Sequence, residues 1–244
     1  VGGDGTLNTV ARAALGQGCP VGVIPQGTFN YFARAHGIPQ DAQAAARALL
    51  RAQPQPVQVG LANGRLFLVN ASLGLHPRLL LEREVRQARW GRRRWVAPLS
   101  YLATLAGWRH RLRLDIEADG RRAQRVTAAL FIGNNRLQLE RLGLRPDVVM
   151  PVGHGEMAGL VLRPMPGWAL LGVAMRAALG RLDDGRDVES FSLRRLTVGM
   201  PGPWRVRVAL DGEVGRMAPP LVFEVSPTPL LLMRPLPQDR VAPG

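Results

Sequence analysis

The fold is decided by residues 1–15, which read VGGDGTLNTVARAAL. The three glycines let the backbone turn sharply, and the apolar residues that follow have the spacing of an amphipathic helix. Such a helix directs the positive end of its dipole, and its free N–H groups, at the loop before it. This stretch therefore predicts a loop that can bind a phosphate group. The other reading is a tight turn in which Asp4 caps the helix.

A second polar loop follows a short β-branched run. Residues 20–25 (PVGVIP) predict a buried strand, and residues 26–30 (QGTFN) form a glycine-containing loop at its end. Helices are expected from Tyr31 and from the N-cap Asp41 to Arg51. This order is typical of α/β domains, in which loops at neighbouring strand ends face one ligand. We expect an α/β domain at residues 1–56.

Beyond residue 56 the apolar pattern alternates, which predicts strands. Asn63-Gly64 lies between two such runs and predicts a β-hairpin. Further strands are expected at residues 111–117, 125–132, 159–163, 191–198, 205–210 and 221–225, with helices at residues 79–110 and 168–179. We therefore expect an α/β plus β fold. Its antiparallel β-sandwich domain with inserted helices spans residues 57–234, and residues 235–244 form a flexible tail.

The charge balance points to anionic partners. Arginine accounts for all 32 basic residues against 18 acidic ones, giving a net charge of +14. The single Cys19 excludes an internal disulfide, and no secretory signal is evident, so a cytoplasmic setting is expected. The uncharged run at residues 96–108 is too short to span a bilayer. Arginines and tryptophans in residues 83–111 predict contact with a membrane surface, although a solvated basic helix has the same pattern.

Two acidic positions are candidates for chemistry. A carboxylate inside a phosphate loop, here Asp4, is repelled by the ligand unless a cation or a hydrogen bond intervenes, which suggests Mg²⁺-nucleotide or ribose contact. Asp211-Gly212-Glu213 reads on its own as a β-turn.

Several motifs together resemble the diacylglycerol kinase catalytic family, which includes bacterial lipid kinases and sphingosine kinases. They are residues 2–8 (GGDGTLN), 22–34 (GVIPQGTFNYFAR), 37–39 (GIP), 70–74 (NASLG), 133–135 (GNN) and 210–213 (LDGE). The resemblance extends over nearly the whole chain. It implies a nucleotide-binding α/β domain, a β-sandwich domain, and ATP-dependent transfer of the γ-phosphoryl group to a lipid hydroxyl such as that of diacylglycerol.

The resemblance also implies roles for individual residues. ATP and Mg²⁺ are the implied cofactors, with Asp4 at the metal. Glu213 and Asp211 are the implied catalytic residues, and Glu213 is the general base. The implied ATP-binding residues are Gly2, Gly3, Asp4, Gly5, Thr6, Asn8, Gly27, Thr28 and Asn30. The implied partner is a lipid substrate at an anionic membrane surface, reached from the cytoplasm at the inner face. No nucleic-acid partner is expected.

Three departures from the family pattern carry further expectations. Tyr31 stands where the family usually has Asp, and His154-Gly155-Glu156 stands at the family's structural metal turn, although Mg²⁺ prefers oxygen to imidazole. Val1 lies inside the phosphate loop, whereas the family has a strand and a helix before this loop. The resemblance therefore implies that the nucleotide-binding domain at residues 1–56 is incomplete at its N-terminus. We expect a loop without an anchoring strand, and weak ATP binding. Two alternatives stay open. They are a kinase for a soluble acceptor, resembling NAD kinases, and an inactive arginine-rich module that binds anionic lipid or nucleic acid.

Overall fold

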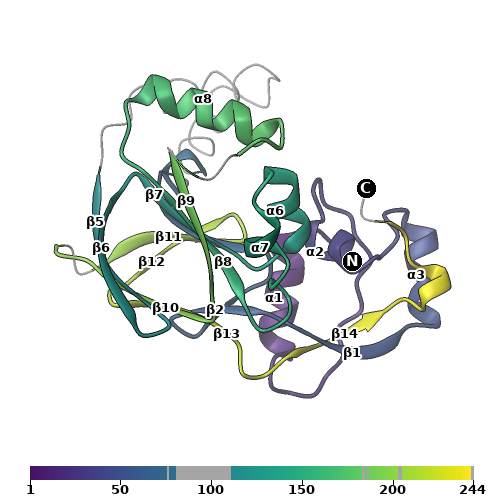
Figure 1. Cartoon of the computed structure of the whole chain (residues 1–244). Helices are drawn as coiled ribbons and strands as arrows, with labels where there is room; N and C mark the ends of the chain where they lie inside the picture. Colours follow the sequence, from purple (N-terminus) through teal and green to yellow (C-terminus); the bar gives the residue numbers. More distant parts are fainter. Residues whose placement is uncertain (76, 81–110, 183–184, 186, 203–204, 243–244) are drawn as a thin grey trace, which may run out of the picture.

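The computed structural model describes residues 1–75, 77–80, 111–182, 185, 187–202 and 205–242 (Figure 1). Nearly all of the basic, tryptophan-rich stretch predicted at residues 83–111, the uncharged run at 96–108 and most of the helix predicted at 79–110 lie outside these residues. Within the described residues, no helix is long and apolar enough to span a membrane.

Three helices and a two-stranded antiparallel ribbon form the first part of the fold. They are α1 (Asp4–Ala14), α2 (Tyr31–Ala35), α3 (Ala42–Leu50), β1 (Gln53–Val57) and β14 (Leu230–Arg234). The Asp41 side chain accepts a hydrogen bond from Ala44 N at 2.8 Å, which confirms the predicted cap of α3. Two prolines fit inside β1 because this strand has a single neighbour, so one row of its N–H groups is not needed for pairing.

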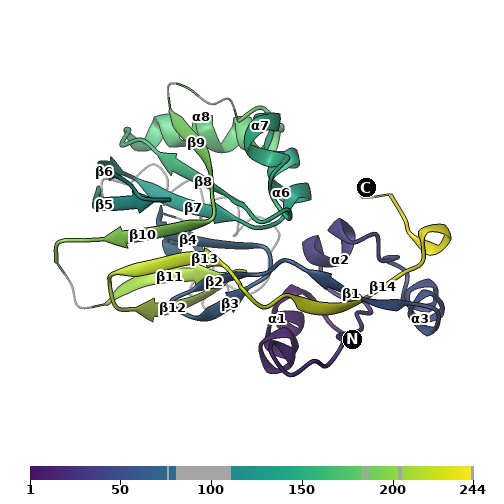
Figure 2. The ribbon, with the colours of Figure 1, turned by 60° about the horizontal axis from the view of Figure 1, so that its bottom comes forward.

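The C-terminal strand β14 completes the core of this first part. Leu230 and Leu232 are buried with Leu7, Val23 and Phe32, which come from the first 32 residues. The run predicted as a strand at residues 20–25 is extended but forms only isolated parallel bridges, from Val21 to Leu232 and from Gly2 to Pro25. Figure 2 shows β1 and β14 side by side next to α1, α2 and α3. The domain division at residue 56 stays a prediction.

Two six-stranded antiparallel sheets form the rest of the chain. The first, in spatial order, contains β3 (Arg65–Phe67), β2 (Gly60–Ala62), β13 (Leu221–Val225), β10 (Arg195–Gly199), β5 (Leu112–Ala118) and β6 (Arg121–Thr127). The second contains β12 (Glu213–Met217), β11 (Val206–Leu210), β4 (Asn70–Gly74), β7 (Ala129–Gly133), β8 (Met157–Leu162) and β9 (Val188–Leu193). Buried residues from both sheets, such as Phe223 and Leu130, share one core. This arrangement confirms the predicted α/β plus β fold with an antiparallel sandwich.

Two strands predicted as single are each divided between the sheets. Residues 125–132 contain the end of β6 and most of β7, and residues 191–198 contain the end of β9 and most of β10. At the first corner, the Thr127 hydroxyl lies within hydrogen-bonding distance of Ala129 O, just after the bend, and of Leu162 O at the end of β8. The Asn63-Gly64 hairpin between β2 and β3 is confirmed, with φ of 45° and 75° at the two residues.

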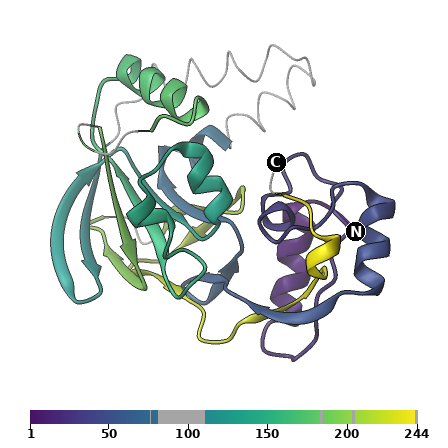
Figure 3. The same ribbon diagram turned by 45° about the vertical axis from the view of Figure 1, so that its right-hand side comes forward.

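Helices cover the outer face of the second sheet. They are α6 (Arg136–Leu142), α7 (Pro146–Val149) and α8 (Gly167–Ala178), of which α8 matches a prediction (Figure 3). Residues 235–241 differ from the flexible tail that the sequence predicts. They form the 3₁₀ helix η1 (Pro237–Asp239), an ion pair from Asp239 to Arg51 at 2.6 Å, and a hydrogen bond from Val241 N to Gly37 O at 3.0 Å. Both partners are distant in sequence, so composition alone does not reveal these contacts.

Candidate active site at the two glycine loops

The two predicted glycine loops meet backbone to backbone. A methyl group placed on Gly27 would lie 2.7 Å from Gly3 Cα, which is closer than real Cβ contacts allow. Glycine is therefore required by this approach. The first loop is also anchored, since Gly2 N donates to Ile24 O at 3.1 Å and Gln26 N donates to Gly2 O at 2.9 Å. The expectation that the first loop lacks an anchor is wrong, because residues 24–26 supply one.

Helix α1 begins at the first of these loops. Gly3 is the N-cap, and its position provides no side-chain hydrogen bond to the first turn. The N–H groups at the start of the helix have no partner within the helix, and they coincide with the positive end of its dipole. Thr6 and Thr28 are exposed beside the two loops. This end of α1 is thus suited to an anionic group.

Asp4 joins the two loops. Its carboxylate accepts hydrogen bonds from Tyr31 N at 3.2 Å and Phe32 N at 3.4 Å, and so caps α2 from the first turn of α1. Burial raises the pKa of Asp4, and the backbone N–H groups oppose that rise. Both contacts are long, which leaves lone pairs on both oxygens for a further partner.

Asn30 shapes the second loop. It adopts a left-handed conformation with φ of 48°, its Oδ1 accepts from Gly27 N at 2.9 Å, and its Nδ2 donates to Gly27 O at 2.9 Å. A further bond from Nδ2 reaches Gln40 Oε1 at 3.1 Å. With its side chain engaged inside the protein, Asn30 positions the loop around a ligand.

Asp211 is held by four hydrogen bonds inside the fold. Its Oδ2 accepts from Asn8 Nδ2 at 2.5 Å and Leu68 N at 2.7 Å. Its Oδ1 accepts from Val69 N at 2.8 Å and Asn70 N at 2.9 Å. Burial raises the pKa of Asp211, and these four hydrogen bonds oppose the rise. The geometry favours a positioning role for both Asp211 and Asn8, which connect α1 to the turn before Glu213.

Glu213 is the exposed carboxylate of this site. It begins β12, and a methyl group placed on Gly5 would lie 3.6 Å from Glu213 Oε1. Among the described residues it has no hydrogen-bond or ion-pair partner. The predicted base therefore lies at the N-terminus of α1 with its oxygens available.

A group of amide side chains links this site to the sandwich. Asn134 Nδ2 donates to Leu68 O at 3.0 Å, and Asn135 Nδ2 donates to Tyr31 O at 3.1 Å. The sequence offered these asparagines only through the family motif. No signal in the sequence pointed to Gln58, whose Nε2 donates to Asn134 Oδ1 at 2.7 Å.

Gln58 also holds the turn at which the family carries a structural metal. Gln58 Oε1 accepts from Gly155 N at 2.8 Å, and Glu156 accepts a short hydrogen bond from Ser192 Oγ. His154 Nδ1 lies 3.3 Å from Met150 O. No cluster of three or more potential metal ligands occurs among the described residues. Protein hydrogen bonds thus hold this turn.

Tyr31 takes part in a stack at the second loop. Its ring is parallel to that of Phe29 at a centroid distance of 5.7 Å, and the Arg141 guanidinium lies 5.9 Å from the Tyr31 ring centroid. Where the family usually has a carboxylate, this chain therefore presents an aromatic ring facing a cation.

An apolar cavity of about 410 Å³ lies beneath α6 and α8, and sequence reasoning did not anticipate it. Gln138 is the one polar residue in its described lining, and Gln138 Oε1 accepts from Asn70 Nδ2 at 3.1 Å. Asn70 N in turn donates to Asp211, and Asn70 Oδ1 is buried without a partner among the described residues. The cavity is thereby connected to the glycine-loop site.

Comparison with known proteins confirms the family resemblance of the first part of the chain. Residues 1–62 match the family model described as "Diacylglycerol kinase catalytic domain". A "Probable lipid kinase YegS-like" of Pseudomonas aeruginosa (strain UCBPP-PA14) is 51% identical over 75 residues, which are 30% of this chain and 24% of the relative. "Diacylglycerol kinase" of Bacillus subtilis (strain 168) is 44% identical over 70 residues, 28% of this chain and 23% of the relative. The match spans about a quarter of these curated relatives.

Solved structures extend the likeness of the fold over almost the whole chain. A diacylglycerol kinase from Bacillus anthracis str. Sterne has a TM-score of 0.65 at 20% identity, covering 97% of this chain and 75% of that one. Yeast NADH kinase complexed with NADH has a TM-score of 0.56 at 13% identity, covering 98% of this chain and 61% of that one. At these identities, the comparisons establish a shared fold.

Proposed function

We propose that this protein is an ATP-dependent lipid kinase that transfers the γ-phosphoryl group of ATP to a lipid hydroxyl, with diacylglycerol as the acceptor to test first. The observation that carries the proposal is the position of Glu213, an exposed carboxylate facing Gly5 at the open N-terminus of α1. Phosphoryl transfer needs positioned phosphates, neutralised charge and a group that accepts the acceptor's proton, and these requirements converge here.

The two glycine loops would bind the ATP phosphates. The open first turn of α1 supplies N–H donors, and the contact of Gly3 with Gly27 brings Thr28 beside it. We assign ATP contacts to Gly2, Gly3, Gly5, Thr6, Gly27 and Thr28, with Asn8 and Asn30 as positioning residues.

Asp4 is the residue we assign to Mg²⁺. This cation typically binds one or two carboxylates together with substrate phosphates, so a single protein carboxylate is sufficient. The long hydrogen bonds to Asp4 fit such a role, because they leave its oxygens able to coordinate. When bound, Mg²⁺ would neutralise charge on the phosphates.

In the transfer itself, Glu213 would accept the proton of the acceptor hydroxyl. The hydroxyl oxygen forms a bond to the γ-phosphorus, and the bond from that phosphorus to the β–γ bridging oxygen breaks, which releases ADP. Asp211 keeps the turn that carries Glu213 in place through its four hydrogen bonds.

The apolar cavity supports a lipid as the acceptor. Its described lining is leucine, valine, alanine and phenylalanine apart from Gln138, and such a surface favours an acyl chain over a soluble nucleotide. The Gln138–Asn70 hydrogen bond leads from it toward the Asp211 turn. We propose that the lipid is presented from an anionic membrane surface on the cytoplasmic side.

The test is transfer of label from γ-labelled ATP to diacylglycerol in mixed micelles, with NAD as a parallel acceptor. Label in the lipid, lost in Glu213→Gln and kept in the surface variant Glu117→Gln, is the expected result. Glu117 is a matched control because it is a partly exposed carboxylate on β5. Label in NADP alone would show a kinase for a soluble acceptor. Absence of transfer together with tight oligonucleotide binding at physiological salt would favour the arginine-rich module.

A further inference from the structure

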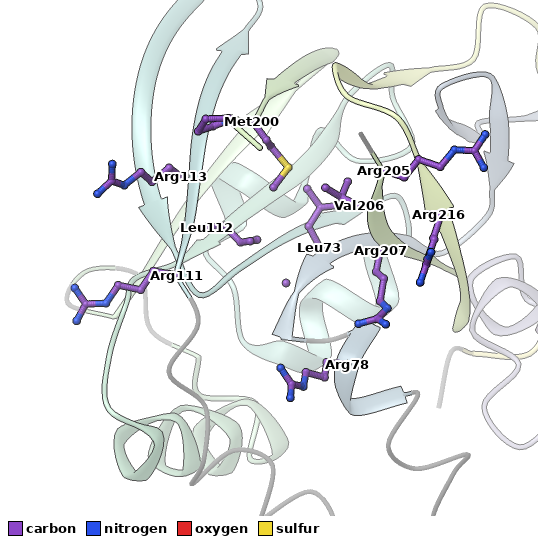
Figure 4. Close-up of a pocket in the computed structure, with 12 residues that line it drawn as sticks. Leu73, Arg78, Arg111, Leu112, Arg113, Met200, Arg205, Val206, Arg207 and Arg216 are labelled. Atoms are coloured by element: carbon purple, nitrogen blue, oxygen red, sulfur yellow. The ribbon is translucent and has the colours of Figure 1, made fainter. Parts of the chain in front are cut away.

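Six arginines surround a second pocket, at the end of the sandwich. This pocket has a volume of about 710 Å³ and lies between β4, the start of β5, the end of β10, β11 and β12 (Figure 4). Its described lining contains Arg78, Arg111, Arg113, Arg205, Arg207 and Arg216 and no acidic residue. The concentration of one charge sign in a single hollow sets this pocket apart from the rest of the described surface.

Several arginines elsewhere on the protein are paired with acids. Arg51, Arg125 and Arg195 are examples, with N–O distances of 2.6–3.1 Å to their carboxylates. Apart from that of Arg78, the side chains of the pocket arginines form no hydrogen bond or ion pair with any described residue. Their charges are therefore uncompensated by the described protein.

Arg207 and Arg216 indicate most clearly that this pocket suits an anion. They are direct cross-strand partners in the antiparallel pair β11–β12. Like charges directly opposite each other destabilise a sheet. An anion between or above the two guanidinium groups would reverse this repulsion, since arginine binds phosphate through paired N–H donors.

The floor of the pocket is apolar. Figure 4 shows Leu73, Leu112, Met200 and Val206 at its centre with the arginines around them. Leu73 is buried in the sandwich core, and the other three pack against that core. A free phosphate would leave this floor in contact with water, whereas a phosphate ester with an apolar group would cover it.

We infer that this pocket binds an anionic amphiphile, a phosphate ester attached to an apolar chain, at a site separate from the glycine-loop site. The pocket and the glycine-loop site lie at opposite ends of the same strands. β4 runs from Asn70, beside Asp211, to Gly74 in the pocket, and β11 runs from the pocket to Leu210. Four residues of strand correspond to about 13 Å. Ligand at the pocket therefore leaves the glycine loops accessible.

The test uses the full chain and monomeric dihexanoyl phosphatidylglycerol in calorimetry at physiological ionic strength. The double variant Arg207→Gln/Arg216→Gln is expected to weaken binding at least about tenfold, because two charge-assisted contacts are removed. Arg47→Gln/Arg121→Gln removes the same charge from exposed positions on α3 and β6 and is expected to leave affinity within about twofold. Equal losses in the two double variants would overturn the proposal.

Two further ligands separate head group from chain. Glycerol 3-phosphate carries the phosphate without the chain, and dihexanoyl phosphatidylcholine carries the chain with a zwitterionic head group. Both are expected to bind more weakly than dihexanoyl phosphatidylglycerol, and equal affinity of either one would overturn the assignment. The ligand could come from a membrane or from solution, so sedimentation with phosphatidylglycerol vesicles is measured beside the monomer titration. Binding to either that depends on the pocket arginines supports the proposal.

The pocket variant also has a control for folding. Removing one pair of facing like charges is expected to leave its Tm equal to or above that of the parent chain. Loss of phosphatidylglycerol binding with Tm retained then reports on the pocket itself. A parent chain that fails to bind phosphatidylglycerol in either form refutes the proposal without bearing on kinase activity, because transfer to diacylglycerol is assayed separately.

Discussion

Asp211 accepts a hydrogen bond from Asn8 Nδ2 at 2.5 Å, which connects the first helix to a turn close to the C-terminal end of the sandwich. The same carboxylate accepts three backbone N–H groups from residues 68–70. One side chain thereby determines where α1, the entry to β4 and the turn carrying Glu213 lie with respect to one another.

Asp211→Asn is expected to lower the free energy of unfolding by about 3 kcal/mol, because the amide NH₂ would face donors that now face a carboxylate. Asparagine accepts the left-handed backbone at this position, where φ is 48°, so the change tests the carboxylate and not the backbone conformation. Urea denaturation measures it. Asp147→Asn, at an exposed ion pair with Arg145, should change the free energy of unfolding by less than about 1 kcal/mol, and a similar loss at both positions would contradict the role of Asp211.

Gly27→Ala is expected to separate the two glycine loops, because its new methyl group would lie 2.7 Å from Gly3 Cα and 2.6 Å from Asn30 Oδ1. We expect at least about tenfold weaker Mg²⁺-ATP binding in calorimetry, since a misplaced loop loses its aligned N–H donors. The control is Gly172→Ala in α8, where the nearest atom is Arg176 Nη1 at 3.6 Å and alanine should add roughly 0.5–1 kcal/mol of stability. ATP affinity unchanged by Gly27→Ala would argue against the two-loop site.

Glu213→Gln is expected to lower kcat by about 100-fold while the Kd for ATP changes less than about threefold, because the base acts on the acceptor hydroxyl. Asp4→Asn should instead weaken ATP and Mg²⁺ binding more than it lowers kcat. Steady-state kinetics with diacylglycerol and calorimetry with Mg²⁺-ATP separate the two. Parallel losses of rate and affinity in Glu213→Gln would contradict a base at this position.

Ala177→Phe is expected to raise the KM for long-chain diacylglycerol, because Ala177 lines the apolar cavity and the larger ring would occupy part of it. The KM for a short-chain diacylglycerol should change far less. Comparison of the two acceptors in one micellar assay measures the difference. An equal rise in both values would place the acyl chain outside this cavity.

His36 makes stability depend on pH. Burial lowers its pKa to about 3, with Arg234 and Arg240 adding to the effect. In the unfolded chain the imidazole titrates near 6.5, so between these two values the unfolded state binds a proton that the folded state does not. The free energy of unfolding should therefore fall as pH drops from about 6.5 toward 3, by up to about 1.4 kcal/mol per pH unit.

The check on His36 is a series of urea denaturation curves over that pH range. His36→Gln cannot titrate and should show a shallower slope than the parent chain. His154→Gln, on an exposed turn, is the matched control and should retain the parent slope. Identical slopes in all three proteins would assign the acid sensitivity to other groups.

Local signals in the sequence were sufficient for the elements whose structure is set by neighbouring residues. The Asp41 cap, the Asn63-Gly64 hairpin and the glycine loops each depend on conformations or hydrogen bonds within a few positions. The sheet corner at Thr127 was missed because a strand that passes from one sheet to the other keeps its apolar pattern. Burial of the Asp211 carboxylate was missed as well, since its partners lie more than 140 positions away.

The pairing of β1 with β14 has a consequence for how the protein is made. During synthesis, the segment containing both glycine loops is made roughly 200 residues before Leu230 and Leu232, which complete its core. At 5–20 residues per second, that interval is on the order of ten seconds or more. The sandwich strands between them can pair meanwhile. We therefore expect the two glycine loops to become ordered after the sandwich, and a nascent chain that stops short of β14 to carry a folded sandwich beside an unfinished N-terminal segment.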